Sequence, residues 1–419
     1  MRFNVTQIVN KGLCTSCGVC AGSCPMDCIS FKYGKERNTP LVAVNKCVNC
    51  GLCYDVCPGK GIELNGWSLN LFGNESGTKI DECAGYYLES YTGHSMNHNI
   101  RMHSATGGMV TQFLIWLLKT KQIEGAVVVR YSKEDPLIAE PIIATNEDEI
   151  WESRSSKYVV LSVDKIAKDI AKGKFKKIVV VGLPCQIQGW RQLAKKNRKI
   201  REAIIGYFAI YCSVNKTKHS IFYYPQRYHV LRNQIARFSF REDGCMGYMK
   251  FEDKEGNVLK KIPYLSYWFG THSFFANPRC SLCIDQLGEL ADVSFGDIHI
   301  KPYSEDLIGT NSIITRTEKW DSLLKKCCKD GLISLDRIPI ETLVSSQVYT
   351  RSFKKGAGVK ANMMLRKIVG KDNPVYDYHY EGPVPLKCYM AEVIKAVMRF
   401  IGRYPYLWWI IRMLDRNKD

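Results

Sequence analysis

Two runs of cysteine near the amino terminus have the spacing of ligands for iron–sulfur clusters. Residues 14–25 read CTSCGVCAGSCP and residues 47–58 read CVNCGLCYDVCP. Each run follows C-x₂-C-x₂-C-x₃-C-P, in which three cysteines hold one [4Fe–4S] cubane and the fourth crosses to the other. The spacing predicts a first cluster on Cys14, Cys17, Cys20 and Cys57, and a second on Cys47, Cys50, Cys53 and Cys24. Structural zinc is the alternative, but zinc sites usually pair two C-x₂-C halves.

Four further cysteines stand where they could converge on a third cluster. The segment IVVVGLPCQ, residues 178–186, predicts a buried strand and a turn that presents Cys185. AIIGYFAIYC predicts another strand, which ends at Cys212. Ligands of an open parallel sheet lie beyond the carboxyl ends of its strands, so both thiols would point into one crevice. The loop NPRCSLCID adds Cys280 and Cys283, which completes the four thiols that a cubane requires.

The case for this third cluster depends on convergence, because a lone cysteine more often packs as a small hydrophobe. The other cysteines lack such spacing and are interpreted as packing or surface thiols: Cys28, Cys83, Cys245, Cys327, Cys328 and Cys388. Asp285, two residues past Cys283, is either a neighbour of the cluster or an ordinary loop carboxylate.

Other polar groups could bind an anion or a ring system. Gly107 and Gly108 precede a helix predicted in ATGGMVTQFLIWLLKT, where backbone N–H groups and the helix dipole can hold a phosphate, or where the pair only caps the helix. SSKYVVL, residues 155–161, offers hydroxyls, a cation and an aromatic ring that could serve a ligand or merely cap and solvate. His272 and His299 are the candidates for a general acid, although a histidine is more often structural.

The elements that must position these residues follow from the pattern of apolar residues. Beyond residue 83 helices alternate with strands such as GAVVVR, which predicts a largely parallel sheet. Residues 234–264 alternate around EDG and EGN turns and predict a small antiparallel sheet that covers the crevice. LADVSFGDIH predicts one more strand, ending at Gly296 and Asp297.

Composition limits the class of protein. The chain has 419 residues, 46% of them hydrophobic and 24% charged, which suggests two or three globular domains. The opening MRFNVTQIVNKG lacks an apolar leader, which predicts a cytoplasmic protein. In that compartment the eighteen cysteines are expected to bind metal through their clustered thiols and not to form disulfides. The formal charge of +18 is weak support for an anionic partner, because thiolates bound to clusters are counted as neutral.

The carboxy-terminal tail is basic and amphipathic. AEVIKAVMRFIGRYPYLWWIIRMLDR, residues 391–416, carries charges that interrupt any apolar run of the roughly 20 residues needed to span a bilayer. The tail could lie on a membrane or a partner surface, or dock as a helix on the protein core.

Residues from about 83 to 345 contain, in order, the motifs ATGGMVTQFLIWLL, SKYVV, VVVGLPCQIQG, RCSLCID, LADVSFGDIH and GTNSIITRTEKW. Together these motifs resemble the coenzyme F420 hydrogenase/dehydrogenase beta-subunit family. The resemblance implies a flavoprotein with a [4Fe–4S] centre near its flavin, FAD or FMN, and coenzyme F420 or another organic hydride acceptor as partner. It also implies the flavin contacts, which are Thr106, Gly107, Gly108, Thr111, Ser156, Lys157, Tyr158, Gly182 and Pro184.

Together these inferences predict an α+β and α/β protein. A ferredoxin-like 2[4Fe–4S] domain (1–66) precedes an α/β flavin-binding domain with a small antiparallel sheet (83–345) and a C-terminal extension (346–419). We expect an oxidoreductase that passes electrons between ferredoxin-type clusters, a third cluster, a flavin and a hydride carrier, with a ferredoxin or other redox protein as partner. The alternative is a non-catalytic electron-transfer subunit. No module that binds nucleic acid is recognisable.

Overall fold

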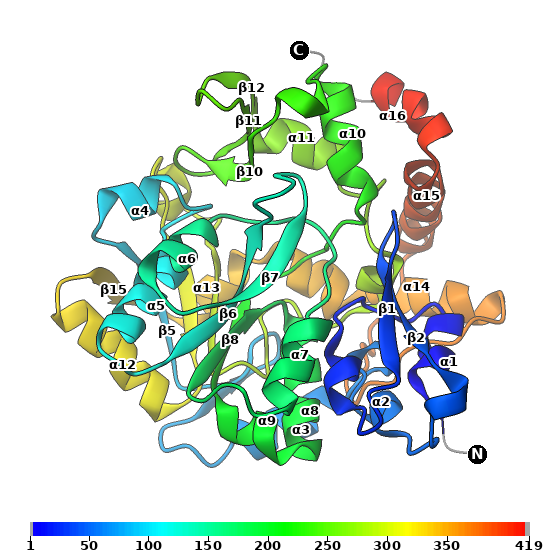
Figure 1. Cartoon of the computed structure of the whole chain (residues 1–419), viewed down its shortest axis with the longest axis horizontal. Helices are drawn as coiled ribbons and strands as arrows, with labels where there is room; N and C mark the ends of the chain where they lie inside the picture. The colour runs from blue at the N-terminus through cyan, green and yellow to red at the C-terminus, as the bar shows by residue number, and fades with distance from the viewer. Residues whose placement is uncertain (1–2, 415–419) are drawn as a thin grey trace.

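A computed structural model describes residues 3–414. The amino-terminal module is a compact unit of short elements beside the main body (Figure 1). Its elements are α1 (Val5–Asn10), η1 (Val19–Ser23), β1 (Ile29–Tyr33), β2 (Asn38–Val42), η2 (Val44–Lys46), α2 (Leu52–Asp55) and η3 (Pro58–Lys60). Helix α3 (Leu64–Phe72) follows and packs against the main body. Gly18 and Gly51 precede η1 and α2 with φ of 84° and 83°. The internal repeat of the sequence is therefore also a repeat of backbone conformation, because these left-handed positions favour glycine.

The main body is built on one eight-stranded sheet. In spatial order its strands are β15 (Ile333–Arg337), β5 (Glu89–Ser95), β14 (Asn311–Thr315), β13 (Val293–Asp297), β9 (Ile204–Ile210), β8 (Ile178–Gly182), β6 (Gly125–Tyr131) and β7 (Ala139–Ala144). Parallel pairing is confined to β6, β8, β9 and β13, and the remaining neighbours pair antiparallel.

The expectation of a largely parallel sheet is therefore correct only at the centre. Parallel neighbours need a crossover, usually a helix. No α-helix separates β6 from β7, or β13 from β14, so each second strand returns antiparallel beside the first.

Helices cover both faces of the sheet. Val127 and Val180 pack toward Trp190 of α8, whereas Val128 and Val179 pack toward Phe113 of α5, because successive strand residues point to opposite faces. The helices on the first face are α7 (Asp164–Ala171), α8 (Pro184–Lys196) and α9 (Arg198–Ala203). Those on the other face include α5 (Met109–Lys119), α6 (Glu147–Glu152) and α12 (Glu318–Lys329). The remaining small elements of the body are β3 (Lys79–Asp81), β4 (Gly85–Tyr87), α4 (His98–Met102), η6 (Tyr303–Glu305) and α13 (Ile340–Ser345).

The predicted small antiparallel sheet is confirmed. It consists of β10 (Arg237–Glu242), β11 (Tyr248–Glu252) and β12 (Val258–Pro263), and lies at the top of Figure 1 with α10 (His219–Arg227), η4 (Arg232–Gln234) and α11 (Tyr264–Thr271). An aromatic core that includes Tyr224, Phe240 and Tyr267 joins the sheet to these helices.

The carboxy-terminal extension returns along the amino-terminal module. It comprises a π-helical turn η7 (Thr350–Lys354), then α14 (Ala357–Ile368), α15 (Leu386–Arg403), η8 (Pro405–Leu407) and α16 (Trp408–Leu414). Trp408 and Ile411 are buried in the aromatic core, and Trp408 Nε1 donates to the Gly402 carbonyl at 2.9 Å. The structure therefore favours the docked-helix alternative for the inner face of the tail. Within residues 3–414, no helix combines the length and apolarity needed to cross a membrane.

Candidate redox site

The thiols assigned to the first cluster are gathered and buried. Cys14, Cys17, Cys20 and Cys57 each expose less than a tenth of their surface. Burial raises the pKa of Cys20 well above its usual value, and the neighbouring Cys17, Cys57 and Cys14 raise it further. These four side chains therefore share one electrostatic environment, as a common ligand set requires.

The thiols assigned to the second cluster line a cavity of about 20 Å³ nearer the surface. Cys24, Cys47, Cys50 and Cys53 surround it, and backbone N–H groups point at two of the sulfurs, from Val5 to Cys53 at 3.3 Å and from Cys28 to Cys24 at 3.4 Å. Cys28 lines the same cavity, with its Sγ 3.3 Å from that of Cys24. Cys28 is buried in the core of the module, as expected of a packing thiol, and its place beside the cavity is an additional finding.

The four downstream thiols converge on a third cavity, of about 40 Å³. Cys185 is the second residue of helix α8, which follows strand β8, and Cys212 follows β9. The C-x₂-C pair comes from η5 (Pro278–Leu282) and the residue after it. Burial raises the pKa of Cys185 well above its usual value, and Cys283, Cys212, Cys17 and Cys280 raise it further. Cys17 also lines the cavity, so the amino-terminal module reaches its wall.

Arg279 ties the loop of the third cavity to the amino-terminal module. This buried guanidinium donates through Nε to the Gly59 carbonyl at 3.0 Å, and through Nη2 to the Pro58 carbonyl at 3.3 Å and to Tyr376 Oη at 2.9 Å. The contacts hold the segment just after Cys57 against the loop that carries Cys280. The two thiol sets are thereby fixed relative to one another.

A much larger cavity, of about 330 Å³, adjoins the third thiol cavity. The residues that line both are Leu161, Leu183, Gln186, Cys212 and Asn215. Most of the predicted flavin contacts line the large cavity, namely Thr106, Gly108, Thr111, Ser156, Lys157, Tyr158 and Gly182. The other two lie elsewhere, because Gly107 is packed against Asn311 and Pro184 lines the thiol cavity.

The side chain of Lys157 forms hydrogen bonds within its own loop. Its Nζ donates to the carbonyls of Ser153 at 2.7 Å, of Ser155 at 3.3 Å, and of Arg154. Burial, with the neighbouring Arg154, lowers the pKa of Lys157 to about 7. Its ammonium group therefore orders residues 153–155, which line the large cavity.

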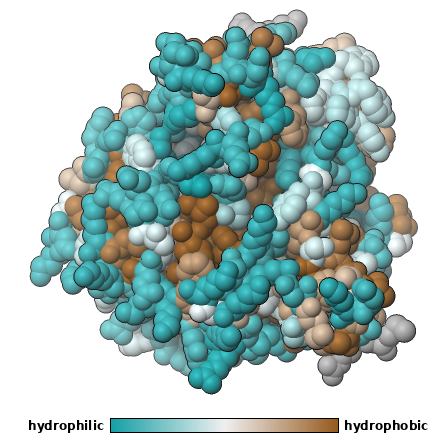
Figure 2. All heavy atoms as spheres, viewed as in Figure 1, coloured by the Kyte–Doolittle hydropathy of each residue, from teal (hydrophilic) through white to brown (hydrophobic). Residues whose placement is uncertain are grey.

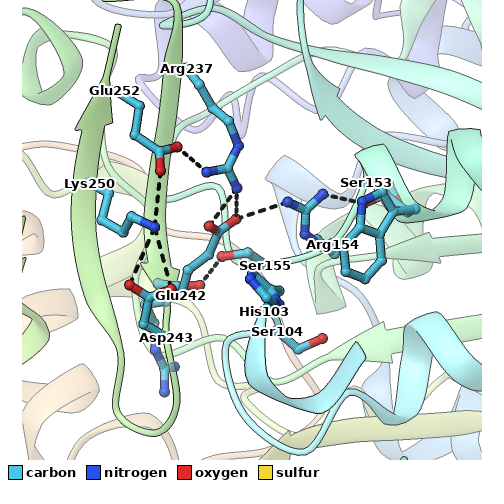
Figure 3. Close-up of polar contacts among 12 residues, drawn as sticks. His103, Ser104, Ser153, Arg154, Ser155, Arg237, Glu242, Asp243, Lys250 and Glu252 are labelled. Atoms are coloured by element: carbon cyan, nitrogen blue, oxygen red, sulfur yellow. Dashed lines mark hydrogen bonds and ion pairs between the residues drawn. The ribbon is translucent and has the colours of Figure 1, made fainter. Parts of the chain in front are cut away.

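A network of charged side chains, which the sequence did not reveal, connects this loop to the small sheet (Figure 3). Glu242 is almost fully buried and accepts from Arg237, and Arg154 approaches it at 3.5 Å. Lys250 continues the network to Asp243 at 3.3 Å and to Glu252 at 3.1 Å. The network ties the small sheet to Arg154 and Ser155, which line the cavity. Arg154 lies far along the chain from the strand residue that it approaches, so no local spacing signals this link.

The cavity has an aromatic wall and convergent polar groups. Tyr158 and Trp268 have ring centroids 4.7 Å apart. Arg241 Nη1 donates to Asp297 at 2.7 Å, while its Nη2 is buried with no hydrogen-bond partner in the described structure. His299 lines the cavity 3.9 Å from Asp297, whereas His272 is not part of the wall.

A site for a single metal ion differs from the thiol sets described above. Within residues 3–414, no group of three or more His, Cys, Asp or Glu side chains has an arrangement suited to one ion. In a [4Fe–4S] cubane each cysteine binds a different iron.

The fold and the thiol sets define an iron–sulfur protein of the oxidoreductase class. Residues 13–61 match the model of the 4Fe-4S dicluster domain. Residues 90–168 and 175–340 match those of the coenzyme F420 hydrogenase/dehydrogenase beta subunit, N-terminal and C-terminal parts respectively. The chain belongs to the coenzyme F420 hydrogenase/dehydrogenase beta-subunit family, as its motifs suggested.

Individual relatives are distant. A coenzyme F420-dependent sulfite reductase from Methanocaldococcus jannaschii is 25% identical over 338 residues, which cover 77% of this chain and 47% of that protein. The chain thus matches about half the length of that relative. A coenzyme F420 hydrogenase subunit beta from Methanothermobacter thermautotrophicus is 28% identical over 298 residues, covering 69% of this chain and 99% of that protein.

A solved structure has the same fold. A chain of the F420-reducing [NiFe] hydrogenase complex from Methanosarcina barkeri superposes with a TM-score of 0.55 and 19% identity. The match covers 71% of this chain and 98% of that chain. At this identity the likeness concerns the fold alone.

Proposed function

We propose that the protein is an iron–sulfur flavoprotein that moves electrons between ferredoxin-type clusters and a two-electron carrier. The observation that carries the proposal is the wall shared by the third thiol cavity and the large cavity, to which Cys212 and Gln186 belong. A flavin, when bound, exchanges electrons singly with clusters and in pairs with hydride carriers.

The proposed order of the redox sites follows from burial. The thiols of the second cavity include the partly exposed Cys24, Cys47 and Cys50, whereas those of the first set are buried. Cys17 of the first set lines the third cavity. We therefore place electron entry at the second cluster, followed by the first, the third and the large cavity.

The large cavity suits a flavin in size and chemistry. Its volume of about 330 Å³ is within the range of pockets for small molecules, roughly 300–1,000 Å³. Tyr158 and Trp268 offer ring faces, and the buried Nη2 of Arg241 and Nε of Arg154 have no hydrogen-bond partner in the described structure, so both can donate to an anionic group. In this proposal, Gly108 and Thr111 at the start of α5 bind phosphate.

The carrier proposed for this chain is coenzyme F420, after the names of its relatives, or another organic hydride acceptor. The proposed protein partner is a ferredoxin or another redox subunit, which would bind at the exposed end of the cluster chain. Met26, Val44 and Val48 are exposed apolar side chains close in sequence to Cys24 and Cys47. They offer a docking surface around the second cluster, and Figure 2 shows apolar side chains gathered over the amino-terminal module at its lower right.

Anaerobic purification tests the proposal. We expect about twelve irons per chain, from three cubanes of four irons each, together with released FAD or FMN and turnover of coenzyme F420 with a reduced ferredoxin. A protein with about eight irons and no flavin would instead be the electron-transfer subunit that forms the alternative. A protein that contains flavin but does not turn over coenzyme F420 would support the proposed electron path and exclude coenzyme F420 as its carrier.

A further inference from the structure

The carboxy-terminal extension inserts a lysine into the third thiol cavity. Lys354 ends the π-helical turn η7 and is 1% exposed. It lines the cavity, within electrostatic range of Cys212, Cys280 and Cys283. The turn lies beyond residue 340, where the match to the family ends. This cation therefore comes from a part of the chain outside the matched domain.

The side chain of Lys354 has no other partner. Among residues 3–414, its Nζ has neither a hydrogen-bond acceptor nor a carboxylate within bonding distance, whereas the adjacent Lys355 pairs with buried Glu289 at 2.9 Å. A buried ammonium group is costly unless an anion or acceptor compensates it. Arg279, the other cation of the cavity wall, is engaged by the carbonyls of Pro58 and Gly59. Lys354 therefore keeps its donors available to the cavity.

We propose that Lys354 is a positioning residue for the third cluster, which places a cation against its thiolates and thereby raises its reduction potential. This inference rests on the proposed function, since it assumes a cubane on the four thiols. Reduction adds negative charge to the cluster, and a buried cation stabilises that charge most strongly where little water screens it. A third cluster with a raised potential draws electrons from the amino-terminal clusters toward the large cavity.

The test compares Lys354→Met, which removes the charge, with Lys354→Arg, which keeps it. Iron is counted in each protein, and the potential of the third cluster is measured by an anaerobic redox titration followed by electron paramagnetic resonance. We expect Lys354→Met to lower the equilibrium constant for reduction of this cluster at least tenfold, about 59 mV for one electron, and Lys354→Arg to restore most of it. The amino-terminal clusters serve as the internal reference.

Each outcome has a defined meaning. Unchanged potential in Lys354→Met at full iron content overturns the proposal. If Lys354→Met loses about four irons and Lys354→Arg retains them, the charge is needed to hold the cluster, which supports the proposal. Loss of iron from both variants shows that the packing of lysine matters instead of its charge, and overturns it. A wild-type protein with only about eight irons refutes the proposed function itself.

A second, independent observation concerns the outer face of α15. Its exposed apolar side chains fall on one stripe at spacings of three and four residues. They are Leu386, Met390, Val393, Ile394, Val397 and Phe400, each at least 50% exposed. Tyr406, Trp409 and Met413 continue the exposed apolar surface beyond the helix. The inner face of the same segment is docked, so this face lacks a partner within the described chain.

The charges around the stripe are basic. Residues 386–414 contain five lysines and arginines and one acid, Glu392. Glu392 is 2% exposed and pairs with Lys395 at 2.7 Å, so it does not face outward. Lys387 and Arg412 are exposed. Exposed aromatic rings beside aliphatic and basic side chains are typical of helices that lie in the interface of an anionic membrane.

We infer that α15 and α16 bind the surface of an anionic lipid membrane. Flotation with vesicles of phosphatidylglycerol and phosphatidylcholine tests this, with phosphatidylcholine vesicles for comparison. The wild type should float at least tenfold more with the anionic vesicles, and Val393→Glu/Val397→Glu should abolish flotation. The matched control, Leu231→Glu/Leu307→Glu, adds the same charges at other exposed apolar positions and should retain it.

Flotation that ignores lipid charge, or that survives the α15 substitutions, overturns the inference. So does failure of the wild type to float. If the wild type forms a dimer that Val393→Glu/Val397→Glu dissociates, the stripe is covered by a second copy, and the membrane assignment is wrong.

Discussion

At the scale of single residues, burial of thiols is the dominant constraint on this molecule. Burial raises the pKa of Cys14 to about 11 and that of Cys17 above its usual value. Without a compensating charge such cysteines stay protonated at neutral pH, whereas metal binding requires the thiolate and releases the proton. Loading of the clusters is therefore coupled to ionisation of side chains that the fold alone would keep neutral.

Removing one ligand of the proposed third cluster should remove its iron selectively. Cys185→Ser is expected to lower the iron content by about four per chain, because each cubane needs four protein ligands. Cys328→Ser is the control, since Cys328 is partly buried on α12 and lines neither of the two thiol cavities. Iron analysis with paramagnetic resonance checks the result. Full iron in Cys185→Ser would contradict the assignment of this thiol.

His272 should make the protein less stable as the pH falls. Burial, with the nearby Lys216 and Lys395, lowers the pKa of His272 to about 4 from an ordinary 6.5. Between those values the unfolded chain binds more protons than the folded one, so the stabilisation present above pH 6.5 is lost as the pH falls toward 4. The full difference is about 3 kcal/mol.

Urea denaturation of the wild type and of His272→Phe, at about pH 7.5 and about pH 5, measures this contribution. The loss of stability on acidification should be smaller in His272→Phe, which cannot titrate. Burial raises the pKa of Glu289 to about 7, so its contribution to the free energy of unfolding changes with pH in the opposite direction. Glu289 is present in both proteins, so this contribution cancels in the comparison. Parallel pH profiles for the two proteins would exclude His272 as the source.

At the scale of elements, the contact between the amino-terminal module and the main body depends on close backbone approach. Gly18 precedes η1 with φ of 84°, and a Cβ there would lie 2.2 Å from Ser162 Oγ and 2.6 Å from the Asp164 backbone nitrogen. Nearby, Tyr33 Oη donates to Asp164 at 2.8 Å. The loop that presents Cys17 is therefore seated directly on the start of α7.

Gly18→Ala should weaken the contact between this loop and the start of α7. The added methyl group meets backbone, and overpacking typically costs about 1–3 kcal/mol, with left-handed strain of about 1–2 kcal/mol in addition. Gly12→Ala is the matched control, because Gly12 has φ of 68° but open space around its Cβ position. The midpoint temperature of thermal unfolding and the iron content should both be lower in Gly18→Ala than in Gly12→Ala. Equal losses would show that backbone strain, not the contact, is responsible.

The elements also show how far sequence patterns reach. Strand β8, helix α5 and the small sheet were predictable because their apolar periods and turns are local. The four thiols of the third cavity were predictable from strand ends and one C-x₂-C pair. The antiparallel strands were not, because the prediction did not register the missing crossover helices. Lys354 and the network around Glu242 depend on contacts between distant segments, and no spacing in the sequence indicates them.

At the scale of the whole molecule, the proposed redox path runs from the partly exposed second thiol set through the first and third sets to the large cavity. Interrupting that path at its exposed end tests its direction. Cys47 is a better target than Cys24, because the Cys28 thiol lies 3.3 Å from that of Cys24 and could replace it. Cys28 also lines the cavity beside Cys47, so the iron count of the variant shows whether Cys28 takes over as a ligand.

Cys47→Ser should therefore slow the entry of electrons without emptying the large cavity. Reduction of the third cluster by a reduced ferredoxin is expected to fall at least tenfold, since electrons must cross the second and first clusters in turn. A hydride donor that reaches the large cavity directly should act as in the wild type, because Cys47 lies outside the wall of that cavity. Stopped-flow absorbance with each donor separates the two routes, with iron counted in parallel to show that the first and third clusters remain. Equal slowing with both donors would mean that the substitution damages the fold, and no slowing with either would place electron entry elsewhere on the molecule.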